Sequence, residues 1–168
     1  ISFDGTGYGT DGTIWGGEIL LADYDSFSRW GCIEPFAQTG GDASAKEGWR
    51  IAVSLIGKIY GKENALLIIE TLGLCEPKMA KLQFTMEERG INTVQSTSAG
   101  RLFDAVSAIL GIRKSSTFEG EASTSLQFAA EKWLDAQKKK IAGSEDFAES
   151  GIITDYGELK SSSDVAQK

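Results

Sequence analysis

The strongest constraint on the fold of this chain is a glycine-rich segment near its start. From Asp4 to Gly17, six of fourteen residues are glycine, in the order DGTGYGTDGTIWGG. Glycine adopts positive φ angles without strain, and its missing side chain lets a second backbone or a ligand come close. Asp4 and Asp11 lie in this segment, and Glu18 follows it directly. The sequence therefore predicts a tight turn that carries a concentration of negative charge.

Two common nucleotide-binding motifs do not explain this segment. Gly7, Gly9 and Gly12 match the G-x-G-x-x-G pattern of dinucleotide-binding proteins. That pattern has to open a helix whose N-terminus faces the pyrophosphate. Here a β-prone Thr-Ile-Trp segment (residues 13–15) follows instead, and the Gly-Lys-Ser/Thr ending of a P-loop is absent from the sequence. We therefore expect a glycine-rich turn between two strands.

Two interpretations of this turn are open. Successive backbone N–H groups in such a turn can form a concave site for an anion such as phosphate. Asp4 would repel a phosphate unless both bound one shared cation, because carboxylate and phosphate oxygens can ligate the same metal ion. Alternatively, the segment is a plain hairpin in which the Asp-Gly pair serves only the turn.

Composition excludes several classes of function. The chain has 168 residues, a net charge of −7 and no histidine. The acidic balance argues against binding of nucleic acid, which requires clustered Lys and Arg. Without histidine, this chain cannot supply a Ser-His-Asp or Cys-His catalytic set or a histidine-based zinc site. No apolar run is long enough for a membrane span, and we expect Cys32 and Cys75 to be reduced thiols in a cytoplasmic protein.

Strands and turns are predicted for residues 1–36, and helices dominate thereafter. Asp42 is the expected N-cap of the first helix and Gly61 its end, in a left-handed conformation. Apolar spacing places Trp49 and Trp133 in the core. Within the polar tail, residues 151–160 are a possible strand and residues 161–168 the start of a helix. The predicted helices cover residues 42–60, 62–74, 77–89, 99–110 and 121–139.

Four segments, in order and spacing, resemble the hydrogenase maturation carbamoyltransferase family, HypF. They are DGTGYGTDGTIWGGE (4–18), GGDASAKEGWR (40–50), INTVQSTSAGRLFDAVSAILG (91–111) and TFEGEAS (117–123). The chain departs from the family pattern at Gly48, where the family usually has Pro, and at Val94, where Pro is common. Neither position is expected to carry chemistry. The chain begins at Ile1 rather than Met, and the resemblance implies that it is a piece of a larger, multidomain enzyme.

The resemblance implies an α/β fold, namely a partial actin-like ATPase (ASKHA) domain with N-terminal β-hairpins and a mostly helical insertion. Residues 1–168 would then be a fragment of the carbamoyl-transfer domain. Its expected parts are a β-rich phosphate-loop region (1–41), the helical insertion (42–90), and nucleotide-side helices with a truncated tail (91–168). From the sequence, the insertion could shape an acceptor channel or only cover the sheet.

The resemblance also assigns roles to individual residues. Asp4 would ligate a metal together with two histidines upstream of this chain and a further Asp beyond its end. Asp104 would contact the nucleotide ribose, unless it is only a buried acid of its helix, and Arg101 could pair with a phosphate or with Asp104. The phosphate cradle would be Gly5, Thr6, Gly7 and Tyr8, and the turn beside the sugar Gly120 and Glu121.

The activity implied by the resemblance is transfer of a carbamoyl group from carbamoyl-adenylate, which the family makes with ATP. The acceptor would be the C-terminal cysteine of the partner protein HypE, and the product would serve synthesis of the cyanide ligand of [NiFe] hydrogenase. A divalent metal, Fe or Zn, would assist. No nucleic-acid or membrane partner is expected, and the chain alone should be inactive because it lacks the upstream histidines. Two alternatives are an O-carbamoyltransferase acting on a small-molecule hydroxyl, and an inactive module that binds a nucleotide or a partner.

Overall fold

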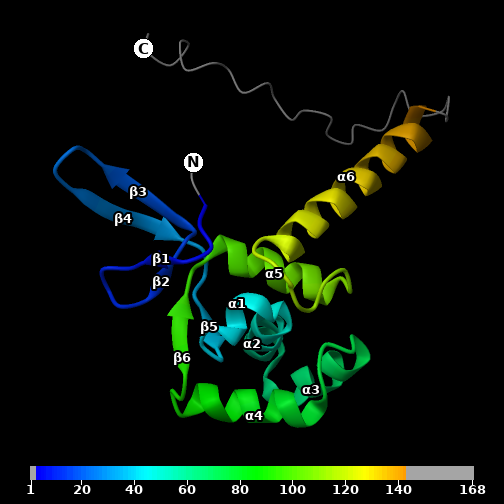
Figure 1. Cartoon of the computed structure of the whole chain (residues 1–168), viewed down its shortest axis with the longest axis horizontal. Helices are drawn as coiled ribbons and strands as arrows, with labels where there is room; N and C mark the ends of the chain where they lie inside the picture. The colour runs from blue at the N-terminus through cyan, green and yellow to red at the C-terminus, as the bar shows by residue number, and fades with distance from the viewer. Residues whose placement is uncertain (1–2, 143–168) are drawn as a thin grey trace. The chain divides into compact units, whose positions relative to one another are not determined.

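The computed structural model describes residues 3–142, with side chains described as far as residue 139 (Figure 1). Within this part the chain is a mixed α/β protein with six strands and six helices. It divides into two compact units, residues 1–131 and residues 132–168. Of the second unit, only the continuation of helix α6 (Glu121–Ala142) lies within the described residues. The strand and helix predicted for residues 151–168 lie outside them.

The larger sheet has the strand order β1-β2-β6-β5. β1 (Gly7–Tyr8) and β2 (Ile14–Trp15) form an antiparallel hairpin around the glycine-rich loop. β6 (Thr93–Ser96) pairs parallel with β2 and antiparallel with β5 (Phe36–Thr39). The predicted turn between two strands is thus confirmed. The pairing also brings a segment about 80 residues downstream against the glycine-rich hairpin.

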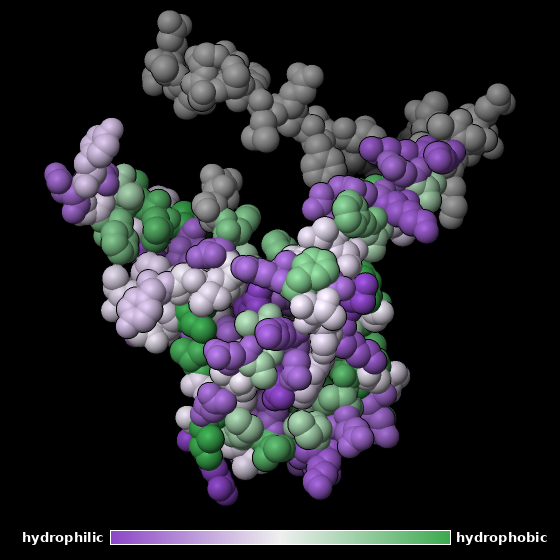
Figure 2. Space-filling view, viewed as in Figure 1, coloured by the Kyte–Doolittle hydropathy of each residue, from purple (hydrophilic) through white to green (hydrophobic). Residues whose placement is uncertain are grey.

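A second hairpin, β3 (Glu18–Ala22) and β4 (Phe27–Cys32), forms a separate two-stranded sheet. Its turn is closed by the Asp23 carboxylate, which accepts hydrogen bonds from the backbone N–H groups of Asp25 and Ser26. Most of its side chains are exposed, and several of these are large and apolar. Figure 2 shows this apolar surface on the hairpin. The exposed members are Ile19, Leu20, Leu21, Phe27 and Trp30.

Four helices lie in sequence between the neighbouring strands β5 and β6, and α5 follows β6 directly. Their order and bounds are α1 (Ala43–Lys46), α2 (Gly48–Tyr60), α3 (Lys62–Thr71), α4 (Pro77–Glu88) and α5 (Ala99–Ile109). α2 packs against β5, α3 and α5, because one face of its surface is apolar. Residues 42–90 therefore do more than cover the sheet, since they supply most of the core. The core side chains are Phe36, Trp49, Ile51, Ala52, Val53, Ile56, Ala65, Ile69, Leu74, Ala80, Phe84, Ala105 and Ala108.

The helix predicted for residues 42–60 is in fact two helices. The backbone leaves helical geometry at Glu47, with φ −104° and ψ 78°, and the Trp49 N–H donates to the Lys114 carbonyl at 3.1 Å. Gly48 opens α2, a position at which Pro is also favoured. An added Cβ there would lie 2.7 Å from the Asp104 carbonyl oxygen. Close contact between α2 and α5 therefore accompanies this break.

Three further expectations need correction. Asp42 is not a side-chain N-cap, because its backbone is already helical and its side chain makes no capping hydrogen bond. Gly61 does end α2 at a positive φ of 76°, but its ψ of 149° is not left-handed helical. Trp49 is buried as predicted, whereas Trp133 is 61% exposed and is not a core residue. The positions of the other helices agree with the apolar spacing to within a few residues at their ends.

Candidate functional site

The glycine-rich hairpin comes within backbone contact of Asp4. The Asp4 N–H donates to the Gly16 carbonyl at 2.9 Å. A Cβ atom added to Gly16 would lie 2.3 Å from the Asp4 carbonyl oxygen and 3.0 Å from Cα of Ser98. Real Cβ atoms do not approach backbone so closely, so only glycine fits at this position. The sequence predicted that a backbone or a ligand comes close to these glycines. At Gly16 it is the backbone of Asp4 and Ser98 that does so.

Helix α5 begins at the same place. Ser98 is its N-cap: the Ser98 hydroxyl accepts from the Arg101 N–H and also donates to the Gly5 carbonyl at 2.7 Å. The Gly100 N–H donates to the Asp4 carbonyl at 3.2 Å, and a Cβ on Gly100 would lie 2.9 Å from Cα of Gly5. Two of the segments that carry the family resemblance, about 95 residues apart, are therefore in direct contact.

The Asp4 carboxylate faces its own loop. Its Oδ1 atom accepts from the backbone N–H groups of Gly5 at 2.6 Å and Thr6 at 3.3 Å. These are two of the donors predicted to cradle a phosphate, and here they serve the neighbouring carboxylate. Among the described residues Asp4 forms no ion pair and its Oδ2 atom has no hydrogen-bond partner, so one oxygen is free for another ligand.

A cavity of about 350 Å³ opens beside this loop. Residues 4–6 line one part of it, Ala45, Lys46 and Arg101 a second, and residues 117–119 a third. Arg101 lies close to the loop, since a Cβ on Gly5 would be 3.6 Å from its Nη2 atom. The lining thus joins the cations Lys46 and Arg101 to the acids Asp4 and Glu119. Such a set can bind an anionic group and a cation together.

Asp104, the predicted ribose contact, is not among the residues that line this cavity. Its carboxylate is almost fully buried and pairs with the Arg101 guanidinium at 3.0 Å. Burial raises the pKa of Asp104, and the nearby Arg101 charge offsets part of that rise. Of the two partners left open for Arg101, the pair with Asp104 is formed, and Arg101 also lines the cavity.

Gly120 and Glu121 shape the turn that lines the cavity. Oε2 of Glu121 accepts from the Thr117 N–H at 2.6 Å and the Thr117 hydroxyl at 3.0 Å, while Oε1 pairs with Arg113 at 3.2 Å. Hydrogen bonds from Thr117 lower the pKa of Glu121. Gly120 has a φ of 77°, which favours glycine. In this structure the two residues hold residues 117–119 in place and leave no free oxygen on Glu121.

Gly7 and Tyr8 line a second, smaller cavity of about 200 Å³, together with Asp4 and Glu18. Tyr8 is 95% exposed, so this part of the second cavity is open to solvent. Asp4 therefore lines both cavities. The predicted loop residues 4–8 therefore line two cavities, with residues 4–6 at the first and Asp4, Gly7 and Tyr8 at the second.

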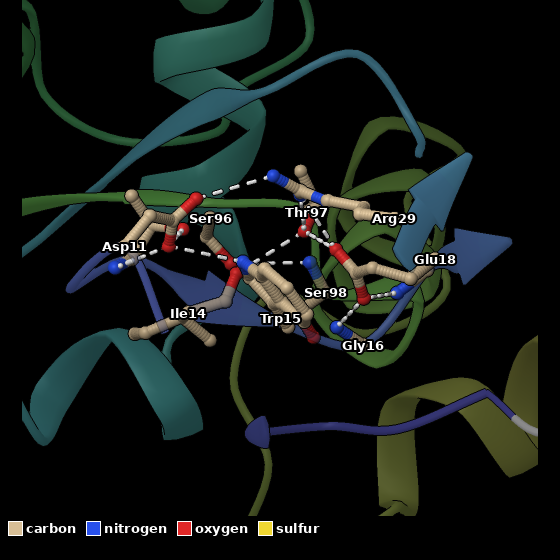
Figure 3. A network of polar contacts seen from close by, with 11 residues as sticks. Asp11, Ile14, Trp15, Gly16, Glu18, Arg29, Ser96, Thr97 and Ser98 are labelled. Carbon is tan, nitrogen blue, oxygen red and sulfur yellow. Dashed lines mark hydrogen bonds and ion pairs between the residues drawn. The ribbon is translucent and has the colours of Figure 1, made fainter. Parts of the chain in front are cut away.

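A polar network next to the hairpin was not predicted from the sequence (Figure 3). The Arg29 guanidinium pairs with Glu18 at 2.8 Å and with Asp11 at 3.2 Å, and lies 4.4 Å from the centre of the Trp15 ring. The Thr97 hydroxyl donates to the Glu18 carboxylate. Glu18 was notable only as a third acid after the glycines. Two of its partners, Arg29 of β4 and Thr97 of the segment before α5, are connected to it by no local spacing.

Within residues 3–142, no group of three or more Asp, Glu, Cys or His side chains could hold a metal ion. Asp4 could therefore provide only one ligand of such a site. Cys32 and Cys75 are both free thiols, as predicted; Cys32 is exposed, and burial raises the pKa of the half-buried Cys75. None of the helices in the described part of the chain is long and apolar enough to span a bilayer.

Comparison with known proteins gives a consistent result. A family model described as "Carbamoyltransferase, Kae1-like Domain, second subdomain" matches residues 1–161. The probable carbamoyltransferase HypF of Methanocaldococcus jannaschii is 39% identical over 133 residues, which are 79% of this chain and 17% of that protein. Carbamoyltransferase HypF of Rhodobacter capsulatus is 40% identical over 138 residues, covering 77% of this chain and 17% of that protein. The chain thus spans about one sixth of the length of these relatives.

Solved structures agree with the mixed α/β fold. Full-length HypF in a phosphate- and nucleotide-bound form superposes with a TM-score of 0.66 at 34% identity, over 74% of this chain and 16% of that one. HypF of T. kodakarensis superposes with a TM-score of 0.62 at 29% identity, over 74% and 17% of the two chains. The family model covers residues 1–161, and the superpositions cover about three quarters of the chain. This chain therefore belongs to the HypF carbamoyltransferase family.

Proposed function

We propose that this chain forms part of a carbamoyltransferase that moves the carbamoyl group of carbamoyl-adenylate to the C-terminal cysteine of a HypE-type partner. The observation that carries the proposal is the cavity of about 350 Å³ beside Asp4. All four segments that resemble the family contribute to its walls, through residues 4–6, residues 45–46, Arg101 and residues 117–119. Further support comes from a relative, full-length HypF, whose crystal structure is a phosphate- and nucleotide-bound form.

The proposed anion-binding group is the Gly5–Tyr8 loop together with the Arg101 guanidinium. Arginine suits a phosphate because its N–H donors form paired hydrogen bonds with two oxygens. A phosphate at the loop would take over the N–H groups of Gly5 and Thr6, which now bind Asp4. For Asp104 to bind the ribose, Arg101 would first have to release it. Gly120 and Glu121 would act by holding the turn beside the sugar.

A divalent metal such as Fe or Zn fits this chain only as an ion shared with ligands from elsewhere. Asp4 would supply one carboxylate oxygen, Oδ2, which has no hydrogen-bond partner among the described residues. When bound, such an ion would neutralise charge on the adenylate phosphate. The chain's own residues would bind and orient that phosphate through backbone N–H groups and Arg101.

The reaction is an acyl transfer. A cysteine thiolate of the partner attacks the carbamoyl carbon, a C–S bond forms, and the bond from that carbon to the phosphate oxygen breaks to release AMP. Donors already placed around the phosphate stabilise the charge that develops on the leaving group. No covalent intermediate on this chain is required. A thiolate acceptor also favours a cytoplasmic location, where cysteines stay reduced.

The test is Asp4→Ala in the full-length protein, with transfer to HypE and formation of carbamoyl-adenylate measured separately. We expect transfer to fall by about 10³-fold or more, as for loss of a group that stabilises transition-state charge, with adenylate formation unchanged. Asp25→Ala is the matched control, because Asp25 is an exposed acid of the β3–β4 turn. Undiminished transfer by Asp4→Ala would refute the proposal. A hydroxyl compound as a parallel acceptor would identify O-carbamoyl transfer instead.

A further inference from the structure

The Glu18 side chain lies next to the glycine-rich hairpin, and both of its carboxylate oxygens accept hydrogen bonds (Figure 3). Its side chain is only 6% exposed. Oε2 accepts from the N–H groups of Gly16 at 2.6 Å and Gly17 at 2.8 Å, while Oε1 accepts from Arg29 at 2.8 Å and from the Thr97 hydroxyl. Because all four partners are donors, they stabilise the anion and leave Glu18 poorly suited to accept a proton or bind a metal.

The first connection from Glu18 to Asp4 runs through Gly16. Glu18 holds the Gly16 N–H, and the carbonyl of the same residue accepts from the Asp4 N–H at 2.9 Å. Gly16 also contacts Asp4 sterically, since an added Cβ would lie 2.3 Å from the Asp4 carbonyl oxygen. A shift of Gly16 would therefore move the backbone of Asp4.

The second connection runs through the start of α5. Glu18 accepts from the Thr97 hydroxyl, and Thr97 directly precedes Ser98. The Ser98 hydroxyl donates to the Asp4 carbonyl at 3.2 Å and to the Gly5 carbonyl at 2.7 Å. Glu18 is thus connected to both sides of the Asp4 loop by separate chains of hydrogen bonds.

Arg29 completes the arrangement from the second hairpin. Its guanidinium neutralises Glu18, pairs with Asp11 and covers the Trp15 ring. The Asp11 carboxylate in turn accepts from the Thr13 N–H at 3.0 Å and from Trp15 Nε1 at 3.1 Å. The two hairpins are therefore joined through one cation.

We propose that Glu18, with Arg29 and Thr97, is the positioning residue for Asp4 and the Gly5–Tyr8 loop. Its anionic carboxylate fixes Gly16 and the N-terminus of α5, and these two fix Asp4. The hydrophobic core lies elsewhere, around α2, so loss of Glu18 should loosen the loop more than the fold. That Glu18 holds the Asp4 loop in place does not depend on the proposed function. The effect of this positioning on catalysis rests on the proposed carbamoyl transfer.

The first test measures hydrogen–deuterium exchange by mass spectrometry in the full-length protein. We compare Thr97→Val, which removes the hydroxyl, with Thr97→Ser, which keeps it, and include Glu18→Gln. Exchange in residues 4–6 should rise about tenfold in Thr97→Val and Glu18→Gln, while Thr97→Ser should resemble the wild type. Exchange in α2 is the internal control and should not change.

Three results would overturn the proposal. Unchanged exchange in residues 4–6 would show that Glu18 does not hold the loop. Equal effects of Thr97→Ser and Thr97→Val would show that the hydroxyl is irrelevant. A rise that includes α2 to the same extent would show that Glu18 supports the whole fold.

The second test measures kinetics with the same variants. We expect kcat for carbamoyl transfer to fall about tenfold in Thr97→Val, with little change in KM for the acceptor, and recovery in Thr97→Ser. Formation of carbamoyl-adenylate should stay constant. A wild-type protein that transfers no carbamoyl group would refute the proposed function and leave the exchange result standing. Unchanged kcat in an active enzyme whose loop exchange has risen would refute the catalytic role of the positioning.

Discussion

The helical region around α2 and the β region before Phe36 are held together by different forces. All fifteen buried apolar side chains among the described residues lie at or after Phe36. Between residues 3 and 35, the buried residues are Gly9, Gly16 and Gly17. The first region is stabilised by burial of apolar surface, and the second by close backbone contacts and charged hydrogen bonds. We therefore expect substitutions in the first to change global stability, and those in the second to change mainly the geometry around Asp4.

The largest effect is expected from a truncation in the helical core. Ile51 on α2 is fully buried, so Ile51→Ala should lower the free energy of unfolding by about 2–5 kcal/mol through lost burial and a cavity. Ile59→Ala is the matched control, because Ile59 is on the same helix but 69% exposed, and its effect should stay within about 0.5 kcal/mol. Urea denaturation measures both. Equal losses of unfolding free energy in the two variants would mean that the buried face of α2 does not stabilise the core.

A smaller loss of stability is expected when a side chain is added where the backbone of the β region is closely packed. The Cβ of Gly16→Ala would meet the Asp4 carbonyl oxygen at 2.3 Å, so the backbone has to move, at a cost of about 1–3 kcal/mol. Binding of AMP should weaken together with stability. Gly31→Ala provides the comparison, since its Cβ would meet nothing nearer than Ile19 Cδ1 at 3.8 Å. If Gly16→Ala bound AMP normally, the contact between Gly16 and Asp4 would not shape the site.

The acid dependence of stability separates the two regions further. Burial raises the pKa of Glu18, but hydrogen bonds from Thr97, Arg29 and two backbone N–H groups outweigh this, so the pKa lies below its ordinary 4.5. A carboxyl with a lowered folded-state pKa stabilises the protein above its unfolded pKa, and this contribution is lost as the pH falls through the folded value.

Glu18→Gln should therefore destabilise the glycine-rich hairpin by about 1–2 kcal/mol at neutral pH, where the charged hydrogen bonds are lost, and should leave global unfolding little changed. The difference from wild type should shrink as the pH falls from 4.5 through the lowered folded-state pKa of Glu18, because the wild-type carboxylate then becomes protonated as well. Hydrogen–deuterium exchange of residues 4–6 at a series of pH values, corrected for the intrinsic rate at each pH, provides the measurement. A difference that did not vary with pH would show that the charge of Glu18 is not what stabilises the hairpin.

The smallest effect is expected at the tip and face of the β3–β4 hairpin. Trp30 is 81% exposed, so Trp30→Ser should change the free energy of unfolding by less than about 0.5 kcal/mol. Thermal denaturation and the exchange of residues 4–6 should both match the wild type. A clear loss of stability would show that the exposed apolar face of the hairpin is covered in solution.

The two regions also differed in how well the sequence predicted them. Helices α2 to α5 follow from apolar spacing and from glycine stops, such as Gly61 and Gly111, because both signals are local in sequence. The break at Glu47 was not predictable, since it accompanies the contact of Trp49 with Lys114 and of Gly48 with α5. Trp133 was misassigned because helical spacing marks a face without showing whether another element covers it.

For the candidate site, the sequence pointed to segments that the structure places around one cavity, without giving their contacts. The loop 4–8 and the turn 117–121 both line or shape cavities beside Asp4. Asp104 and Glu121 were assigned to the nucleotide, but in this structure their carboxylates bind Arg101, Arg113 and Thr117. A motif gives the residue type at a position, whereas the direction of its side chain depends on packing against other elements.

The sequence by itself determined the glycine-rich turn between two strands, the helical spacing and the absence of any histidine. These are properties of neighbouring residues or of composition, and they hold whatever surrounds them. Only the tertiary structure decided that Gly16 lies against Asp4, that Ser98 caps α5 over the same loop, and that Glu18 is joined to Thr97 and Arg29. Those contacts connect residues up to about 95 positions apart, and the contacts of Thr97 and Ser98 accompany the pairing of β2 with β6, which no local pattern encodes.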